Sequence, residues 1–254
     1  MPDSAPLENS PAPGWKCDFH IHTTEDPCDP VPHTAVELVE RAAALGFGAV
    51  SITLHGAQTP LPQAQARAEA LGVCLIPGIE FRFGGKDIIG MNLEAADAAR
   101  IRSVEDLRTA KKDYGDRLFI IAPHPFYVLA GSMNHRFYLW RDLFDAVEIT
   151  RIHTWGLSRN GPAIREAKRF GLPVVANSDT HALRHFGKHY SVVEGEGLAT
   201  PASVFAAIRR GAVRTVCPPL TPWLFAWEMA DMIIGQPLRR SEASRQAKTE
   251  LDRR

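Results

Sequence analysis

The sequence predicts an α/β barrel, and three observations support this fold class. Short apolar runs alternate with amphipathic stretches from about residue 15 to residue 217, as expected for repeated strand–helix units around a largely parallel sheet. Seven or eight such repeats in roughly 200 residues fit a closed barrel better than an open sheet. Neither GxGxxG nor GxxxxGKS/T, the glycine-rich loops that often accompany open nucleotide-binding sheets, is present.

Each element is predicted from the period of its apolar residues and from the turn residues that bound it. The predicted strands are Lys16–Ile21, Ala49–Leu54, Val73–Ile79, Ile88–Leu93, Leu118–Ala122, Ala146–Thr150, Leu172–Ala176 and Ala212–Val216. The predicted helices are Thr34–Leu45, Pro62–Leu71, Val104–Lys112, Asn134–Leu143, Gly161–Phe170, Pro201–Arg210 and Thr221–Gly235. Thr34 is expected to cap the first helix, and Gly46 to end it.

The two ends of the chain differ from the predicted barrel, which spans residues 15–217. Residues 1–14 are rich in Pro, Ser and Ala and predict a disordered arm. Residues 218–254 predict a helix followed by a polar tail. The aromatic stripe of this helix is expected to pack on the outside of the barrel. The side chains of that stripe are Trp223, Phe225, Trp227 and Met232.

Composition limits the classes of protein to which the chain can belong. Its 254 residues are 45% apolar, and 29 Lys and Arg balance 29 Asp and Glu, so no global basic surface for long nucleic acid is indicated. No apolar run approaches the roughly 18 residues of a membrane span, and residues 1–14 do not have the pattern of a signal peptide. We therefore expect a cytoplasmic protein that does not act at a membrane. The four cysteines form no CxxC pair and predict free thiols.

Histidines and carboxylates recur at the carboxyl ends of the predicted strands. These residues are His20, His22, His55, Glu80, His124, His153, Asp179 and His181. In a parallel barrel these strand ends meet at one rim, where barrel enzymes place their active sites. One histidine near a strand end is weak support for a site, but the placement repeats at six strands. His33 and His135, in contrast, lie near helix starts and predict ordinary surface positions.

Imidazole and carboxylate are the ligands expected for Zn²⁺, Mn²⁺ or Fe²⁺. Residues two apart on a strand point the same way, so His20 and His22 can bind one ion together, as can Asp179 and His181. Eight ligands exceed the needs of one ion. The sequence therefore predicts two or three divalent ions, bridged by Glu80 or Asp179.

These motifs, in this order, resemble the polymerase-and-histidinol-phosphatase (PHP) superfamily. The resemblance rests on His-x-His, Thr-x-His, Pro-Gly-Ile-Glu, Ala-x-His-Pro and Ser-Asp-x-His, and it extends from about Asp18 to Val216. It implies a distorted seven-stranded (β/α) barrel of the TIM type, in which two or three metal ions hydrolyse phosphate esters.

The resemblance also implies how the ligands are shared among the ions. His20, His22, Glu80 and Asp179 would hold one ion, and Glu80 would bridge to a second ion bound by His124 and His153. A third ion would use His55, His181 and a carboxylate from the loop after the first motif. Asp29 is the first choice for that carboxylate and Asp26 the second, with Cys28 as a more remote alternative ligand.

One departure from the family pattern concerns the third ion. Leu54 stands where many relatives carry an aspartate, so His55 is expected to lack a carboxylate partner from that position.

The expected reaction is hydrolysis of a small phosphorylated substrate or of a nucleotide phosphate ester by a metal-bound hydroxide. His181 or His55 would protonate the leaving group, with Asp179 as the third candidate catalytic residue. Arginine forks suit phosphate, and the candidates near the rim are Arg82, Arg151 and Arg184. Two alternatives remain open: a barrel amidohydrolase that cleaves C–N bonds, and an accessory domain without activity. The oligomeric state is not predicted.

Overall fold

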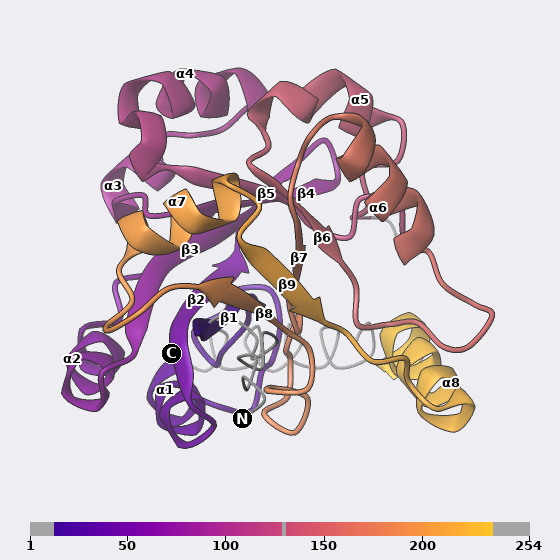
Figure 1. Cartoon of the computed structure of the whole chain (residues 1–254), viewed down its shortest axis with the longest axis horizontal. Helices are drawn as coiled ribbons and strands as arrows, with labels where there is room; N and C mark the ends of the chain where they lie inside the picture. The colour runs from indigo at the N-terminus through magenta and orange to yellow at the C-terminus, as the bar shows by residue number, and fades with distance from the viewer. Residues whose placement is uncertain (1–12, 129–130, 236–254) are drawn as a thin grey trace, which may run out of the picture.

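A computed structural model describes residues 13–128 and 131–235 of the chain, so most of the predicted N-terminal arm and the predicted polar tail lie outside it. Within this part, nine strands form one sheet in the order β7-β6-β5-β4-β3-β2-β1-β8-β9 (Figure 1). The strands are β1 (Gly14–Ile21), β2 (Phe47–His55), β3 (Cys74–Phe83), β4 (Lys86–Met91), β5 (Phe119–Ala122), β6 (Ala146–Ile149), β7 (Val174–Ala176), β8 (Tyr190–Glu194) and β9 (Val213–Val216).

The sheet curls into a nearly closed barrel, because β7 at one end of the strand order lies against β9 at the other. Seven of the described strands run in one direction, whereas β4 and β8 run antiparallel to both of their neighbours. The predicted distorted α/β barrel is therefore confirmed.

The strand predicted at Ile88–Leu93 corresponds to β4, which is one of the exceptions to the largely parallel sheet that was expected. Gly84 and Gly85, which join β3 to β4, have φ angles of 55° and 75°. Two glycines in the left-handed region make a tight hairpin turn, and such a turn reverses the chain. The other reversed strand, β8, was missed altogether. It follows β7 after a loop with no helix, so the strand–helix alternation gave no reason to expect it there.

Eight α-helices accompany the sheet in the described residues. They are α1 (Ala35–Ala44), α2 (Pro62–Leu71), α3 (Ala95–Ala98), α4 (Val104–Tyr114), α5 (Arg136–Trp140), α6 (Asn160–Arg169), α7 (Pro201–Arg209) and α8 (Pro222–Ala230). The Thr34 side chain accepts from the backbone N–H of Glu37 and caps α1, as predicted. The short helix α3 was not predicted. None of the described helices has the length and apolarity that crossing a membrane requires.

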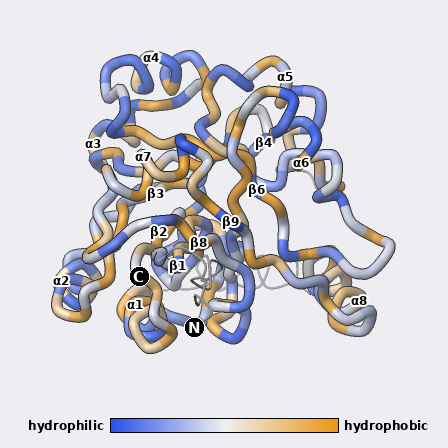
Figure 2. The backbone as a smooth tube through the Cα atoms, in the orientation of Figure 1, coloured by the Kyte–Doolittle hydropathy of each residue, from blue (hydrophilic) through white to orange (hydrophobic). Residues whose placement is uncertain are grey.

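The apolar interior of the barrel is closed at one end by α7. Phe205 and Ile208 of α7 pack with inward residues of the strands, and the Phe205 ring stacks on Phe119, the first residue of β5, at 4.8 Å. Because α7 fills the end where strands begin, the other end, where they finish, is left for a functional site. The strands in the middle of Figure 2 are correspondingly apolar, and polar residues concentrate on the surrounding helices and loops.

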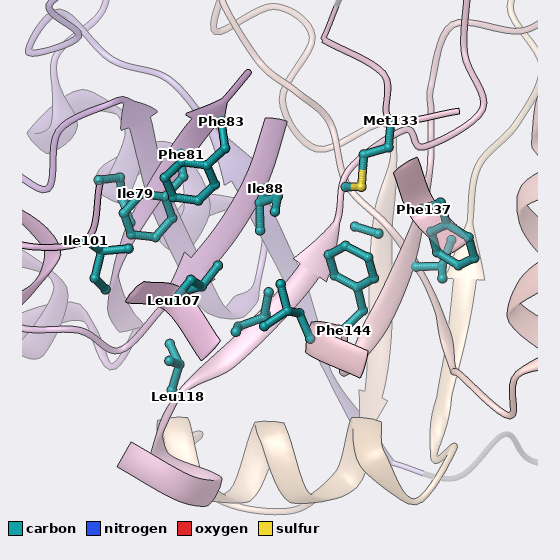
Figure 3. Packing of buried hydrophobic residues seen from close by; sticks show 14 of the residues in the cluster. Ile79, Phe81, Phe83, Ile88, Ile101, Leu107, Leu118, Met133, Phe137 and Phe144 are labelled. Carbon is teal, nitrogen blue, oxygen red and sulfur yellow. The ribbon is translucent and has the colours of Figure 1, made fainter. Parts of the chain in front are cut away.

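A second apolar cluster lies outside the barrel wall, between the strands and the helices that cover them. Figure 3 shows Ile79, Phe81 and Ile88 on one side of this cluster and Phe137 and Phe144 on the other. This packing fixes β3 and β4, and with them the position of Glu80 at the barrel rim.

The last helix, α8, does not pack as predicted. Trp223 is 87% exposed and Trp227 is 47% exposed, whereas Glu228 is the buried side chain of this helix. The expectation that its aromatic stripe packs on the barrel exterior was therefore wrong for both tryptophans. Apolar residues at helical spacing show that a helix has an apolar face, but they do not show what that face covers.

Candidate metal centre

The structure brings seven of the eight predicted strand-end ligands together at the barrel rim opposite α7. These residues are His20, His22, His55, Glu80, His124, Asp179 and His181. Each follows or ends a strand, so the barrel itself delivers side chains separated by up to 161 residues to one place. His20 and His22 are fully buried, and Glu80 is 2% exposed.

Two carboxylate oxygens and two imidazole nitrogens of this cluster lie close together. Glu80 Oε2 lies 3.4 Å from Nε2 of both His20 and His22, and Asp179 Oδ1 lies 3.5 Å from the same two nitrogens. A zinc-sized ion about 2.1 Å from each ligand separates tetrahedral ligands by about 3.4 Å. The four atoms are therefore spaced as ligands of one ion would be.

The buried atoms of this group lack other partners. His20 Nε2, His22 Nε2 and Glu80 Oε2 are buried and make no hydrogen bond within the described structure. An unsatisfied buried polar atom costs about 1–3 kcal/mol, more if it is charged, so three of them side by side indicate a ligand. The residues present therefore fit a divalent cation.

The charges at the rim also favour a cation. Burial alone would raise the pKa of Glu80 and Asp179, but the neighbouring imidazoles, His20 foremost, lower both pKa values, and both carboxylates stay ionised. Burial lowers the pKa of His20, yet Asp179, Glu148 and Glu80 outweigh it and hold that pKa well above its ordinary value. Burial and the neighbouring His181 and His55 rings lower the pKa of His22, which keeps its imidazole neutral.

Two carboxylates orient these imidazoles: Glu148, which the sequence analysis did not name, and Asp26, which it named only as the second choice for a metal ligand. Glu148 Oε2, on β6, accepts from Nδ1 of His20 at 3.1 Å and from Nδ2 of Asn177 at 2.8 Å. Asp26 Oδ2 lies 2.9 Å from Nδ1 of both His22 and His55. An imidazole held at Nδ1 presents Nε2 to a metal, so both carboxylates fix the ligand tautomer. The signal that could have revealed Glu148 is a single charged residue inside an apolar strand.

The position of Asp26 corrects the expectation about Leu54. An aspartate at position 54 is not needed to support His55, because Asp26 reaches the same ring from the loop after β1. The other oxygen of Asp26, Oδ1, accepts from the backbone N–H groups of Cys28 and Asp29, so both oxygens are engaged. Asp29, by contrast, places Oδ2 3.0 Å from Nε2 of His181 and 3.9 Å from Nδ1 of His55. Of the two aspartates, Asp29 is the one that faces the cluster as a ligand would.

Unusual backbone geometry directs two of the ligands. His124 has a φ of 28° and Asp179 a φ of 46°, a region that residues other than glycine rarely occupy. Such conformations cost about 1–3 kcal/mol each and are typical of functional positions. In this barrel they turn His124 toward Glu80, with Nε2 4.0 Å from Oε1, and Asp179 toward His20 and His22.

The eighth predicted ligand, His153, lies elsewhere. Its Nε2 is 3.2 Å from the backbone oxygen of Cys217 and 3.4 Å from the Cys217 sulfur. The residues after β6 therefore carry His153 toward the segment that follows β9. His33 also departs from its prediction: it is 4% exposed, not a surface residue, and burial lowers its pKa. His135 is exposed, as predicted.

The three candidate arginines occupy different surroundings. Arg82 pairs with Asp87 through two hydrogen bonds. Arg151 is buried and pairs with Glu228 of α8 at 3.0 Å. Arg184 is exposed, and its guanidinium lies over the Trp227 ring at 5.2 Å. The structure thus places Arg151 and Arg184 on the α8 side of the rim and Arg82 at the end of β3.

Residues 158–213 match a family model described as PHP-associated. A DNA polymerase III of the PolC type from Clostridium perfringens is 40% identical over 65 residues. That segment is 26% of this chain but only 4% of the polymerase, so the two proteins share one small part.

Several solved structures have a similar fold. PsfC from Pseudomonas syringae has a TM-score of 0.61 at 13% identity, covering 90% of this chain and 98% of PsfC. A two-domain protein from Bacteroides vulgatus, containing a predicted PHP-like metal-dependent phosphoesterase, has a TM-score of 0.58 at 16% identity; 80% of this chain and 65% of that protein are covered. The lesion-specific endonuclease Q of Pyrococcus furiosus has a TM-score of 0.58 at 15% identity, covering 79% of this chain and 57% of the endonuclease.

An amidohydrolase from Chromobacterium violaceum with bound sulfate is also similar, with a TM-score of 0.51 at 17% identity over 78% of this chain and 97% of that one. At these identities the likeness concerns the fold, which serves more than one reaction. The match of the PHP-associated model to residues 158–213, the nearly closed barrel and the ordered motifs at its rim together support a relationship of this chain to the PHP superfamily.

Proposed function

We propose that the chain is a metal-dependent phosphoesterase, acting on a small phosphate monoester or a nucleotide phosphate ester. The observation that carries this proposal is the spacing of His20, His22, Glu80 and Asp179, whose carboxylate oxygens lie 3.4–3.5 Å from the two Nε2 atoms. Bound Zn²⁺, Mn²⁺ or Fe²⁺ would acidify a water molecule and neutralise charge on the phosphoryl oxygens.

Further ions can use the rest of the cluster. Glu80 faces His55 through Oε2 at 3.2 Å and His124 through Oε1 at 4.0 Å, so its two oxygens can bridge neighbouring ions. His55 and Asp29, whose Oδ2 lies 3.9 Å from the Nδ1 of His55, supply further donors. Two or three ions therefore suit the donor set, as the sequence predicted.

The two candidate proton donors differ in where they lie. His55 faces Asp26 with Nδ1 and Glu80 with Nε2 and does not line the cavity beside the cluster, so a ligand role suits it. His181 lies at the edge of that cavity, with Nδ1 3.6 Å from Asp179 and Nε2 3.0 Å from Asp29. We therefore assign protonation of the leaving group to His181, and to Asp179 the joint role of metal ligand and partner of His181.

The alternatives concern the bond that is cleaved. The amidohydrolase from Chromobacterium violaceum shares the fold, and so does an endonuclease Q whose structure holds a 27-mer duplex with an abasic lesion. A C–N substrate and a DNA substrate therefore belong in the same test as a phosphate monoester.

The test measures metal content and hydrolysis for the full chain loaded with Mn²⁺, Zn²⁺ or Fe²⁺. The substrates are p-nitrophenyl phosphate, bis-p-nitrophenyl phosphate, a DNA duplex with an abasic site and dihydroorotate. We expect hydrolysis of phosphate esters that EDTA abolishes, and no turnover of dihydroorotate.

The variant His20→Ala/His22→Ala should lose bound metal and more than about 100-fold of this activity, because it removes two ligands of one ion. The matched control is His135→Ala, which changes an exposed histidine outside the cluster. Full metal content and activity in the double variant would rule out the proposed function, as would selective hydrolysis of dihydroorotate.

A further inference from the structure

A cavity of about 290 Å³ lies directly beside the candidate metal centre. At one end it is lined by His181 and Asp29, which belong to the ligand cluster, and at the other by Arg151, His185 and Glu228. Its volume is in the range of small-molecule sites. A substrate whose phosphorus is held at the metal centre can therefore extend its leaving group into this cavity.

The buried cation of the cavity is Arg151. Its side chain is 7% exposed and its Nη2 donates to Glu228 Oε2 at 3.0 Å, but its Nε–H is buried and has no hydrogen-bond partner within the described structure. Leaving a buried charged donor unsatisfied is unfavourable. The ion pair with Glu228 engages Nη2, and the Arg151 side chain lines the cavity.

Arg151 is separated from the ligand cluster in its contacts. The groups it influences are Tyr127, His185, His189 and Glu228, none of which belongs to the cluster. The scissile phosphate has to lie against the metal ligands, so we take Arg151 to face a different group of the substrate.

The remaining charges divide the cavity into two ends. Asp29 lies at the metal end beside His181, and Asp231 of the turn after α8 also lines the wall. Arg184, exposed and stacked on Trp227, adds a second cation on the side of Arg151. An anionic group is therefore favoured beside the two arginines, away from Asp29.

We propose that the substrate carries a second anionic group on its leaving group, and that Arg151 binds this group at the α8 end of the cavity. The inference rests on the proposed function, since it takes the phosphate to lie at the metal centre. It narrows the substrate class to phosphate esters of hydroxy acids or of other alcohols that carry a carboxylate, sulfonate or second phosphate.

The test is a binding measurement that does not depend on turnover. Isothermal titration calorimetry of the Mn²⁺-loaded full chain compares ω-carboxyalkylphosphonates having one to four methylenes with alkylphosphonates of the same length. The phosphonate replaces the scissile phosphate, and the methylene series finds the length that reaches Arg151. We expect one carboxylated member of the series to bind at least tenfold more tightly than its alkyl counterpart.

Three variants assign that preference to a residue. Arg151→Met should reduce it to less than twofold, and Arg210→Met, which removes an exposed arginine outside the cavity, should leave it intact. Because Arg151→Met strands Glu228, the double variant Arg151→Met/Glu228→Gln keeps the buried pair neutral and should show the same loss. Circular dichroism verifies that each variant is folded.

Equal affinity for the two ligands at every chain length overturns the inference, and so does a preference that survives in both Arg151 variants. Failure of the proposed function looks different: the chain would then hydrolyse no phosphate ester, whichever phosphonate it prefers.

Discussion

Two neighbouring groups of histidines differ in what faces their rings. At the metal centre, carboxylates face the imidazoles: burial lowers the pKa of His55, but hydrogen bonding to Asp26 and the charge of Glu80 raise it to about 9. Around the α8 cavity, burial is reinforced by the Arg151 cation, and the pKa values of His185 and His189 are lowered to about 4. The carboxylates around the first group attract cations, whereas the imidazoles of His185 and His189 stay neutral at pH 7.

The difference shows that the partners of a histidine, and not its place in the sequence, determine its chemistry. His181 and His185 are four residues apart in one loop, yet His181 faces Asp29 and Asp179, whereas His185 lies against Glu228 and near Arg151. A loop without regular structure therefore serves two sites at once.

The largest effect is expected at the residue that joins the most ligands. Glu80→Gln removes the carboxylate that faces His20, His22 and His55, so we expect more than about 1,000-fold loss of phosphoesterase activity and loss of bound metal. Mass spectrometric metal analysis and steady-state kinetics measure both. Glu194→Gln, at an exposed strand end, is the matched control. If Glu80→Gln kept its metal, Glu80 would not be a metal ligand, and the group of histidines around it would not be a metal centre.

A smaller effect is expected for a carboxylate that acts through an imidazole. Glu148→Gln weakens the bond to Nδ1 of His20, so metal affinity should fall about 10- to 100-fold, with activity restored at high metal concentration. Metal titration of activity measures this, and Glu194→Gln again serves as the control. A loss that no metal concentration restores would indicate that Glu148 acts in another way.

The comparison of His124 with His153 sharpens the boundary of the metal centre. His124→Ala should lower activity by about 10- to 100-fold, because it removes a ligand beside Glu80. His153→Ala should change activity and metal content less than about threefold, because that ring faces Cys217. Parallel metal analysis and kinetics decide between them. An equal loss in the two variants would return His153 to the ligand set that the sequence predicted.

The smallest effect concerns stability in acid. Because burial lowers the pKa of His189 to about 4, the unfolded chain binds a proton below about pH 6.5 that the folded chain does not bind until about pH 4. Stability is therefore lost as the pH falls through this window. His189→Gln should reduce the loss between pH 7 and pH 5 by about 1–2 kcal/mol in urea denaturation. His135→Gln, at an exposed histidine, should not alter it. An unchanged pH dependence in His189→Gln would place its titration outside this window.

Much of the fold and of the metal cluster could be predicted because both follow from repetition. Strand–helix alternation gave eight of the nine strands, and strand ends gave seven side chains that the barrel does gather. The direction of β4 depends on the φ angles of Gly84 and Gly85, which the amino-acid sequence does not specify. Glu148 was not named because its partner His20 lies far away in the sequence, and Asp26 was named as a possible ligand because its contacts with the Nδ1 atoms of His22 and His55 depend on ring orientation.

The face of a helix that becomes buried was equally inaccessible to sequence reasoning. Trp223 and Trp227 lie on the apolar side of α8, but the buried side chain of this helix is Glu228. Its burial is possible because Arg151 and His185 form ion pairs with it. A charged residue in an apolar helix gives little indication that it is buried until its partner is located.

Asp26 has a consequence for how the cluster fills. One of its oxygens accepts from the rings of both His22 and His55, and the other is tied to the loop backbone at Cys28 and Asp29. Any shift of that loop moves both imidazoles and Asp29 together. An ion that settles against His22 therefore pre-orders donors for its neighbour, so the sites should load cooperatively, with a sigmoidal metal titration.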